Sequence, residues 1–466
     1  MMSKKLPITS NYDPETWAMP DGWGAGTHDA KAPPSTTLYP DINDYSRVEV
    51  DRYFSSEFMN KEWTHLWHRT WTCAGRVQDV ASPGNFFRYD LGHESFVIMR
   101  GKDKKIRAFY NVCQHRGRRL VDSDFGSRSH LVCPFHSWSY DLEGQNIRVT
   151  DREVFSESAL CGDLNLKSVR CETWGGFVFI NMNPNAPSLE SFLGELPKLM
   201  ASYQMEDMHV VKDVVLPVDC NWKTGLEAFL ESYHLHVTHP QALGAVEDVF
   251  NQLDVYVNGH SRLCSPVAKP SERMASKKEV NPLLQFLLSD AGIDPETFKG
   301  SAADVRKAIA ESKRKPGNYF GLDYSGFTDS QITDDWNYFV FPNMTLNSHP
   351  EGILIMRFLP DANDPNRHYY HVQVIIPKLK PGAKAPFYMA VPEEQDISGA
   401  VRPERRYTNM ENPELGQVLE QDLSNMEGTQ QGLRSNGFPG GMRYAEHEKR
   451  IQVLHAELDL YLRGLK

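Results

Sequence analysis

The apolar residues from Thr72 to Asn181 fall in short runs that turn residues separate. Runs of this length, rich in aromatic and β-branched residues, predict strands. Four of them are the clearest candidates: 85–89, 95–100, 106–110 and 176–181. Just before this region, apolar residues between Val48 and Trp71 recur at roughly helical spacing, which predicts an amphipathic helix. The pattern predicts a small all-β domain that follows a helix.

The pattern changes in the second half of the chain. The stretch from Asn221 to Thr238 predicts helix, and a long irregular and helical region follows at about 241–334. Further strands are predicted at 337–341, 353–358 and 369–376. Two helices are predicted after them, at 415–433 and 443–465. This combination predicts an antiparallel sheet covered by helices. The fold class expected for the whole chain is therefore α+β.

Composition suggests three regions. Residues 1–46 are rich in Pro, Gly, Asp, Ser and Thr, which predicts an irregular N-terminal extension. Residues 47–183 contain the helix and the all-β domain, and residues 184–466 form the larger α+β domain, with an insertion at about 241–334.

Charge and hydropathy exclude some classes of function. The chain has 466 residues and a formal net charge of −11, so it lacks the basic character of a general binder of nucleic acid or anionic membrane. No apolar run approaches the roughly 18–20 residues that span a bilayer. The N-terminal residues show no apolar core of a secretory signal, so we expect a cytoplasmic protein.

Two short segments of the β domain pair cysteine with histidine. Cys113 and His115 form a C-x-H pair, and Cys133 and His136 form a C-x-x-H pair. A Rieske 2Fe-2S cluster requires two thiolates on one iron and two imidazoles on the other. Structural zinc is the alternative, but its ligands are usually grouped Cys with Cys and His with His. The mixed pairs favour the Rieske cluster over zinc or a chance arrangement.

Three histidines, His234, His236 and His239, lie in the last turn of the predicted helix at 221–238 or directly after it. Non-haem Fe(II) oxygenases bind iron with two His and one carboxylate. His234 and His239 are five residues apart, about 140° around an ideal helix, so a bulge or a helix end must separate them. Pro240 favours such an end at His239. His236 points to the opposite side and is expected to be a structural residue, and the carboxylate must come from a distant segment.

Together these motifs resemble the Rieske non-haem iron ring-hydroxylating oxygenases, in their terminal oxygenase alpha subunit. The resemblance covers 48–183, 214–240 and 415–432. It implies that Cys113, His115, Cys133 and His136 hold a Rieske 2Fe-2S cluster, and that the larger domain is a helix-grip-like catalytic domain. It also implies that His234, His239 and Asp422 hold a mononuclear Fe(II). A solvated helix face with Glu420, Asp422 and Glu427 is the alternative interpretation of the last segment.

Two positions depart from the family pattern. Ser137 stands where the motif usually has Gly, and we expect local strain there. Glu231 stands where the family more often has Asp, one turn before His234 on the same predicted helix face. The resemblance implies that Glu231 hydrogen-bonds His234 and also His136 of a neighbouring subunit. The Glu-for-Asp change is similar to the subset that includes several monooxygenases and demethylases.

The resemblance implies an enzyme that consumes O2 and electrons from NAD(P)H. No nucleotide-binding fingerprint is present, so a separate reductase, with or without a ferredoxin, is expected to deliver the electrons. We expect a homotrimer, and the sequence leaves open whether a β subunit joins it. Apolar residues suggest hydroxylation of an aromatic or other hydrophobic organic substrate; the pocket candidates are Phe229, Leu230, Leu235, Phe341, Met344 and Met426. The alternatives are a monooxygenase or demethylase of a small polar or quaternary amine, and a non-enzymatic electron-transfer or zinc protein.

Overall fold

The computed structural model describes residues 18–20, 45–438 and 440–466. These residues divide into two compact units: Asn60–Phe192 with Pro360–Asp364 form one, and the segment up to Met59 with Leu193–Leu359 and Pro365–Leu465 forms the other. We call them the cluster-loop unit and the large unit. Most of the predicted extension at 1–46 lies outside the described residues. The predicted boundaries at 46/47 and 183/184 stay predictions.

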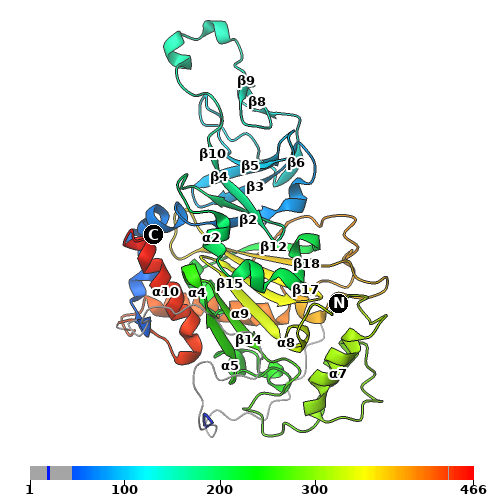
Figure 1. The fold of residues 1–466 in the computed structure, drawn as a ribbon. Helices are drawn as coiled ribbons and strands as arrows, with labels where there is room; N and C mark the ends of the chain where they lie inside the picture. Colours follow the sequence, from blue (N-terminus) through cyan, green and yellow to red (C-terminus); the bar gives the residue numbers. More distant parts are fainter. Residues whose placement is uncertain (1–17, 21–44, 439) are drawn as a thin grey trace. The chain divides into compact units, whose positions relative to one another are not determined.

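The cluster-loop unit is built on antiparallel strands in the order β2-β11-β10-β5-β4-β3-β6 (Figure 1). Their bounds are β2 (Thr72–Arg76), β3 (Asn85–Leu91), β4 (Glu94–Arg100), β5 (Ile106–Tyr110), β6 (Phe125–Ser127), β10 (Ser168–Trp174) and β11 (Phe177–Asn181). The four strands predicted from the sequence are β3, β4, β5 and β11, so the expected all-β character is confirmed. A smaller sheet contains β7 (Leu131–Val132), β8 (Ser139–Tyr140) and β9 (Asn146–Arg148).

The helix predicted between Val48 and Trp71 is interrupted. A 3-10 turn, η2 (Val50–Tyr53), precedes α1 (Ser56–Glu62), which continues as a π-helical turn, η3 (Trp63–Trp67). Phe54 leaves helical geometry between η2 and α1, with φ −140°. Ser55 then restarts the helix, because its side chain accepts a hydrogen bond from the backbone N–H of Phe58. The spacing of apolar residues identified the helical segment but not this break.

The large unit is organised around a sheet with strand order β13-β14-β15-β16-β17-β18-β12-β19. The bounds are β12 (His209–Val218), β13 (Gln252–Val255), β14 (Ser261–Ser265), β15 (Asp335–Val340), β16 (Met344–His349), β17 (Gly352–Pro360), β18 (His368–Ile376) and β19 (Arg406–Tyr407). Strands β15, β17 and β18 confirm the predicted strands. Strands β13 and β14 lie inside the region expected to be irregular and helical, so that expectation was wrong for these residues.

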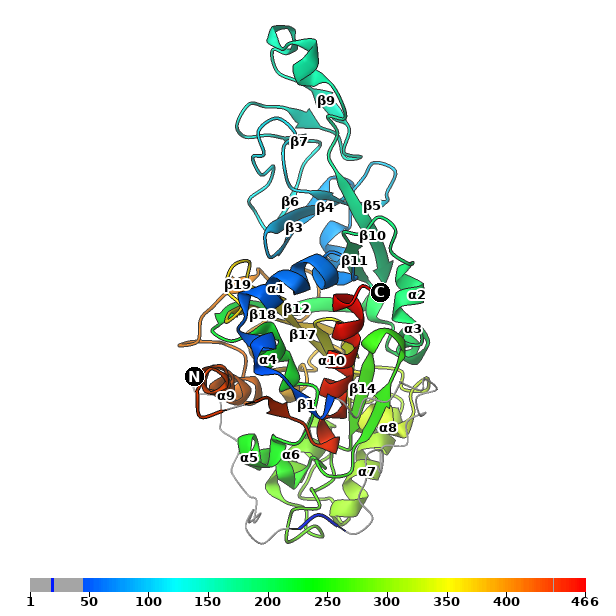
Figure 2. The ribbon, with the colours of Figure 1, turned by 90° about the vertical axis from the view of Figure 1, so that its left-hand side faces the viewer.

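Helices α4 (Trp222–Glu227), α9 (Gln417–Leu433) and α10 (Lys449–Leu462) lie against one face of this sheet (Figures 1 and 2). Gly225 of α4 approaches His368 and Phe358, where a Cβ atom would lie 2.7 Å and 3.1 Å from their rings. From α10, buried Arg450 donates a hydrogen bond to Asn337 of β15 at 2.8 Å. This sheet, antiparallel except for the edge pair β12–β19, and the helices on its face confirm the expected α+β, helix-grip-like fold.

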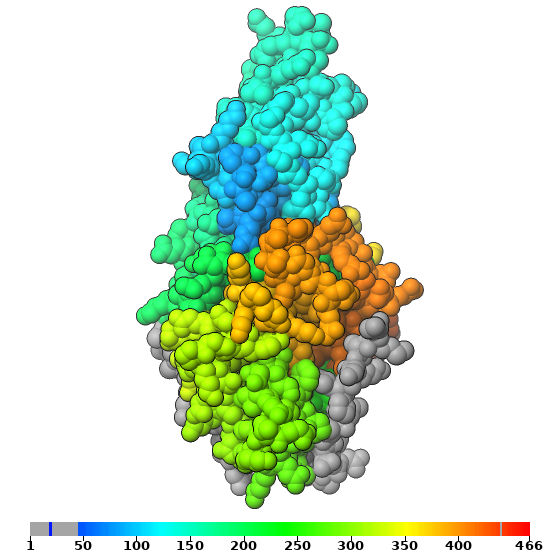
Figure 3. All heavy atoms as spheres, turned by 90° about the vertical axis from the view of Figure 1, so that its right-hand side faces the viewer, coloured from blue at the N-terminus to red at the C-terminus, as the bar shows by residue number. Residues whose placement is uncertain are grey.

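Three further helices, α6 (Pro282–Asp290), α7 (Ala302–Arg314) and α8 (Asp329–Thr333), occupy the segment between β14 and β15. Figure 3 shows α7 (yellow-green) and the connection from β18 to α9 (orange) side by side on one face of the large unit. Two contacts join the segment between β14 and β15 to this connection: the ring of Phe286 in α6 lies 4.5 Å from that of Phe387, and the N–H of Lys380 donates to the carbonyl of Phe320, which follows α7.

The long connection into α9 is anchored to β12. The buried Lys212 ammonium donates to the carbonyls of Ala390 and Leu415 at 2.8 Å and 3.0 Å. The adjacent carboxylate of Asp213 pairs with Arg402 at 2.6 Å. These contacts hold the middle of the connection and its end at Leu415, two residues before α9 begins. Within the described part of the chain, no helix is both long and apolar enough to cross a membrane.

Candidate metal centres

The two Cys/His segments of the cluster-loop unit adopt the same backbone turn. The N–H of Cys113 donates to the carbonyl of Arg118, and the N–H of Gly117 donates back to Cys113. Likewise, Cys133 donates to Trp138, and Ser137 donates back to Cys133. The fourth residue after each cysteine has positive φ: 74° at Gly117 and 60° at Ser137. The expected strain at Ser137 is confirmed, because a side chain in this left-handed region costs about 1–2 kcal/mol.

The two turns bring the predicted cluster residues together. Cys113 and Cys133 are buried, each only 2% exposed, and the rings of His115 and His136 lie 4.6 Å apart. Burial raises the pKa of the Cys113 thiol and lowers the pKa of His115. The Nδ1 atoms of both histidines are buried without a hydrogen-bond partner. Because buried polar atoms normally have partners, two thiols and two unpartnered imidazoles fit the donor set of a Rieske cluster.

Two aromatic residues, Tyr140 and Trp138, support this site, and neither was assigned a role from the sequence. The hydroxyl of Tyr140 lies 3.4 Å from Sγ of Cys113 and accepts a hydrogen bond from the N–H of Gln114. The ring of Trp138 stacks on His115 at 4.9 Å. Since both follow Cys133 within seven residues, the available signal was an aromatic residue on the strand just after the second pair.

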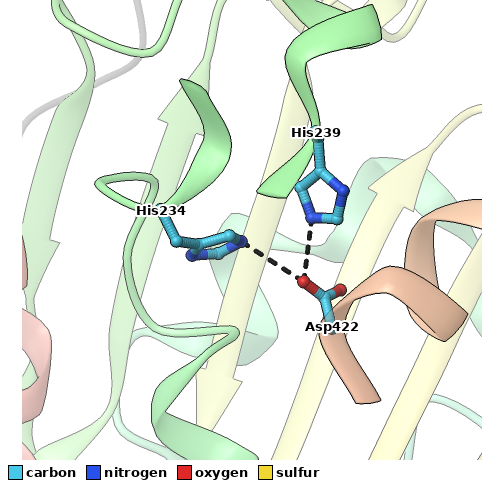
Figure 4. Close-up of side chains that lie close together, drawn as sticks. All are labelled: His234, His239 and Asp422. Atoms are coloured by element: carbon cyan, nitrogen blue, oxygen red, sulfur yellow. Dashed lines mark hydrogen bonds and ion pairs between the residues drawn. The ribbon is translucent and has the colours of Figure 1, made fainter. Parts of the chain in front are cut away.

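In the large unit, His234, His239 and Asp422 converge, and we call these three residues the triad (Figure 4). His234 begins α5 (Leu235–Thr238), and His239 ends it with non-helical φ −123° and ψ 53°. The helix end predicted at His239 is confirmed. One ligand atom from each of the three residues lies within 4.8 Å of the others, a spacing that can hold a metal ion.

The carboxylate of Asp422 faces both imidazoles. Its Oδ1 lies 2.8 Å from Nε2 of His239 and 3.4 Å from Nε2 of His234. Asp422 is 4% exposed, so it does not belong to a solvated helix face. Burial alone would raise the pKa of Asp422, but the hydrogen bonds with His234 and His239 outweigh it and lower the pKa. Two histidines and one carboxylate, buried together, fit the donor set of a non-haem Fe(II) site.

Glu231 contacts His234 through a turn and not along a helix. Helix α4 ends at Glu227, and the side chain of Glu231 accepts hydrogen bonds from the backbone N–H groups of Tyr233 and His234. The prediction that Glu231 and His234 share a helix face was therefore wrong, because this carboxylate caps the turn that precedes α5. Its Oε1 also lies 2.5 Å from Nδ1 of His234. Although burial acts in the opposite direction, Glu231 and Asp422 raise the pKa of His234 to about 10.

Two other residues considered from the sequence, His236 and Met344, lie away from His234, His239 and Asp422. His236 lies away from the triad, with Nδ1 3.9 Å from a carboxylate oxygen of Asp248. Met344 pairs with Arg357 across β16 and β17. Arg357 hydrogen-bonds His371, which alternates along β18 with Tyr370, so Met344 faces away from the α4 side of the sheet. Met344 is therefore not a pocket residue.

Phe229 lies on the α4 side of the sheet. Its ring packs 5.5 Å from Phe358 and 5.8 Å from Tyr370. Burial raises the pKa of Tyr370, and the charge of Asp422 adds to the effect, which places this aromatic group within electrostatic reach of the triad. Of the remaining pocket candidates, Phe341 stacks on Tyr461 of α10 at 5.5 Å, and Met426 is buried one turn after Asp422 on α9.

Two family models match the chain. The ring hydroxylating alpha subunit (catalytic domain) family matches residues 205–464, and the Rieske [2Fe-2S] domain family matches residues 70–157. The first match contains His234, His239 and Asp422, and the second contains both Cys/His pairs.

Characterised relatives share moderate identity. The glycine betaine monooxygenase oxygenase subunit of Pseudomonas aeruginosa (strain UCBPP-PA14) is 32% identical over 196 residues, which are 41% of this chain and 44% of the relative. The carnitine monooxygenase oxygenase subunit of Escherichia coli (strain K12) is 31% identical over 226 residues, 47% and 59% of the two chains. The chain thus spans about half the length of the curated relatives it matches.

Solved structures share the fold. A quaternary ammonium Rieske monooxygenase, CntA, in complex with L-carnitine has a TM-score of 0.61 at 20% identity, covering 91% of this chain and 99% of that one. Naphthalene 1,2-dioxygenase with indole bound has a TM-score of 0.59 at 19% identity, covering 87% and 90%. At these identities the likeness concerns the fold alone.

Proposed function

Because the chain belongs to the ring hydroxylating alpha subunit family, we propose that it is the terminal oxygenase of a multicomponent system. A Rieske [2Fe-2S] domain precedes its catalytic domain. The observation that carries the proposal is the convergence of His234, His239 and Asp422 from separate elements of the large unit. Two imidazoles and a carboxylate with ligand atoms within 4.8 Å of one another fit the donor set of a non-haem Fe(II) site.

The residues divide into two sets. Cys113, His115, Cys133 and His136 would hold the Rieske 2Fe-2S cluster, and His234, His239 and Asp422 would hold the mononuclear Fe(II). When bound, these groups supply stored electrons and the activation of O2. The overall reaction inserts one oxygen atom of O2 into a substrate C–H bond, and the other leaves as water with two electrons from NAD(P)H and two protons.

The side chain of Glu231 orients one of the residues that would hold the iron. Glu231 fixes the ring of His234, since a carboxylate at Nδ1 holds the proton there and leaves Nε2 for a metal. We also assign Glu231 a contact with His136 of the partner subunit in a homotrimer, so that the same carboxylate links the two centres of neighbouring chains. NAD(P)H reacts on a separate reductase, with or without a ferredoxin, because the sequence shows no nucleotide-binding fingerprint.

The proposed substrate is a small quaternary or polar amine, which undergoes monooxygenation or oxidative demethylation. The sequence alone favoured an aromatic or other hydrophobic substrate, but relatives named for glycine betaine and carnitine support the amine alternative better. One feature of the large unit agrees with a cation. The rings of Phe229 and Phe358 pack against Tyr370, whose pKa is raised by burial and by the charge of Asp422, and aromatic faces attract quaternary ammonium groups.

The test is a substrate panel with product masses. Full-length protein with both iron centres, a reductase and NADH is offered trimethylammonium carboxylates or naphthalene. We expect NADH-dependent gain of one oxygen atom, or loss of a methyl group as formaldehyde, with the amines only. Addition of two oxygen atoms to naphthalene with no amine turnover would overturn the amine assignment. Asp422→Ala is the control, and it should retain the Rieske EPR signal and lose turnover.

A further inference from the structure

The two imidazoles of the triad are held differently on the side away from Asp422. Nδ1 of His234 faces a carboxylate, Glu231, at 2.5 Å. Nδ1 of His239 faces a neutral amide, with Oε1 of Gln421 at 3.0 Å. An amide oxygen only accepts hydrogen bonds, so this contact requires a proton on Nδ1 of His239. With that proton held on Nδ1, the atom left to bind a metal through its lone pair would be Nε2, which lies 2.8 Å from Asp422.

Gln421 is itself oriented by Gln241. The amide nitrogen of Gln241 donates to Oε1 of Gln421 at 2.6 Å, and the amide nitrogen of Gln421 lies 3.4 Å from the oxygen of Gln241. Gln241 is 2% exposed and lies in η9 (Pro240–Gly244), two residues after His239. The same short segment therefore supplies the imidazole and the group that orients its hydrogen-bond acceptor.

A second contact holds α9 against this segment. One turn after Gln421, the side-chain nitrogen of Asn425 donates to the hydroxyl of Thr238 at 3.3 Å. Because Gln421 precedes Asp422 in α9, the helix that supplies the carboxylate ligand also supplies the acceptor for the neighbouring imidazole. A displacement of α9 would thus change two contacts of the site together.

We propose that Gln421, oriented by Gln241, is a positioning residue that fixes the tautomer of His239 and thereby sets how tightly the mononuclear site holds a divalent metal. This inference rests on the metal site of the proposed function.

The experiment measures metal binding without turnover. Full-length protein with its Rieske cluster intact is freed of mononuclear metal by a chelator and titrated with Co²⁺. Bound Co²⁺ is measured by equilibrium dialysis, and its environment is read from the high-spin Co²⁺ EPR signal. Gln421→Leu removes the acceptor but keeps the size, and we expect a 10- to 100-fold rise in Kd, the usual cost of losing such a partner.

Two further variants separate positioning from a general structural role. Gln421→Glu keeps an acceptor at the same place, so it should bind Co²⁺ at least as tightly as the wild type, with a shifted EPR signal. Gln241→Leu leaves the acceptor but frees it, and we expect a smaller rise in Kd than for Gln421→Leu. Gln431→Leu, an exposed position on the same helix, is the matched control and should leave Kd unchanged.

The outcomes are distinguishable. Wild-type Kd in Gln421→Leu, or equal weakening in Gln421→Leu and Gln421→Glu, would overturn the role of Gln421. If Gln421→Leu does not fold, Gln241→Leu is compared with Gln421→Glu. A raised Kd in Gln241→Leu alone supports the role of Gln421, and wild-type Kd in Gln241→Leu or equal weakening in both variants overturns it. If the wild-type protein fails to bind one Co²⁺ outside the Rieske cluster, the metal site of the proposed function fails instead.

Discussion

The carboxylate of Glu231 lies 2.5 Å from Nδ1 of His234 and also accepts hydrogen bonds from the backbone of the turn that carries this histidine. The negative charge of Glu231 therefore acts on the imidazole of His234, while the turn that carries His234 holds the carboxylate in place. In Glu231→Gln the amide oxygen can still accept from Nδ1, but the negative charge is lost. We expect iron content and the Rieske EPR signal to stay at wild-type levels.

Turnover by Glu231→Gln should fall at least about 10-fold, since groups that contact metal-bound imidazoles typically contribute this much to activity. The measurement is amine-dependent NADH oxidation, together with single-turnover reoxidation of the reduced Rieske cluster. Loss of mononuclear iron from this variant would contradict the expectation, because it would mean that Glu231 acts mainly by holding the site together.

Tyr140 should raise the reduction potential of the Rieske cluster. Its hydroxyl lies 3.4 Å from Sγ of Cys113, and a hydrogen bond to a cluster sulfur stabilises the reduced, more negative state. Removing a bond of about 1 kcal/mol corresponds to about 40–50 mV in a one-electron couple. Tyr140→Phe should therefore lower the potential by tens of millivolts in a redox titration followed by EPR.

The matched control for this prediction is Tyr110→Phe. Tyr110 ends β5 in the same unit, and its ring packs 5.1 Å from Phe96. This substitution removes a tyrosine hydroxyl without removing a cluster contact, so the potential should not change. An equal shift in both variants would show that the effect of Tyr140 is indirect.

The residues that the sequence identified as cluster and metal ligands are those that the structure brings together, because each motif is short and chemically specific. Mixed Cys/His pairs and a histidine followed by proline restrict the local geometry before any tertiary contact is known. The residues that orient the ligands were not predictable in this way. Gln421 acts on His239 from a helix that lies far along the chain, and nothing in a lone glutamine signals that contact.

Dependence on contacts with distant residues also explains why strands β13 and β14 were not predicted. β13 and β14 bury polar side chains, among them Asp254 and Arg262, which pair at 2.6 Å. A strand whose buried positions are charged shows no apolar run, and its pairing depends on partners that the sequence does not reveal. Met344 illustrates a related error. Its apolar character suggested a pocket residue, but the register with Arg357 turns it to the other face of the sheet.

Ser137→Gly should stabilise the cluster-loop unit. Ser137 has φ 60°, where glycine avoids a penalty of about 1–2 kcal/mol that a side chain incurs. Part of this gain is lost because glycine also adds freedom to the unfolded chain, so we expect about 1 kcal/mol. Thermal or urea unfolding of the protein with its cluster bound measures the difference.

Gly117 provides the reciprocal test of this backbone effect. It occupies the equivalent position of the first turn with φ 74°, and a Cβ there would meet only Val112, at 4.0 Å. Gly117→Ala should therefore destabilise by about 1 kcal/mol through backbone conformation alone. Opposite signs for the two substitutions are the expected result, and equal signs would contradict the equivalence of the two turns.

His368 should make the large unit sensitive to mild acid. It begins β18, is fully buried, and its Nδ1 lies 2.9 Å from the carbonyl of Cys220. Burial lowers the pKa of His368 to about 4, although the carbonyl acts in the opposite direction. Between pH 4 and about 6.5 the unfolded chain binds a proton at this residue and the folded chain does not. The free energy of unfolding must therefore decrease as the pH falls through this window, by up to about 3 kcal/mol from this group.

His368→Gln should flatten this dependence, because glutamine keeps a donor for the Cys220 carbonyl but takes up no proton. Urea unfolding of both proteins at intervals from pH 4 to 8 gives the two curves. The absolute stability of the variant does not matter for the test, since a packing defect shifts the whole curve and leaves its slope. Exposed His93 is the control position, and His93→Gln should run parallel to the wild type. Parallel curves for His368→Gln and the wild type between pH 4 and 6.5 would show that another group carries the acid sensitivity.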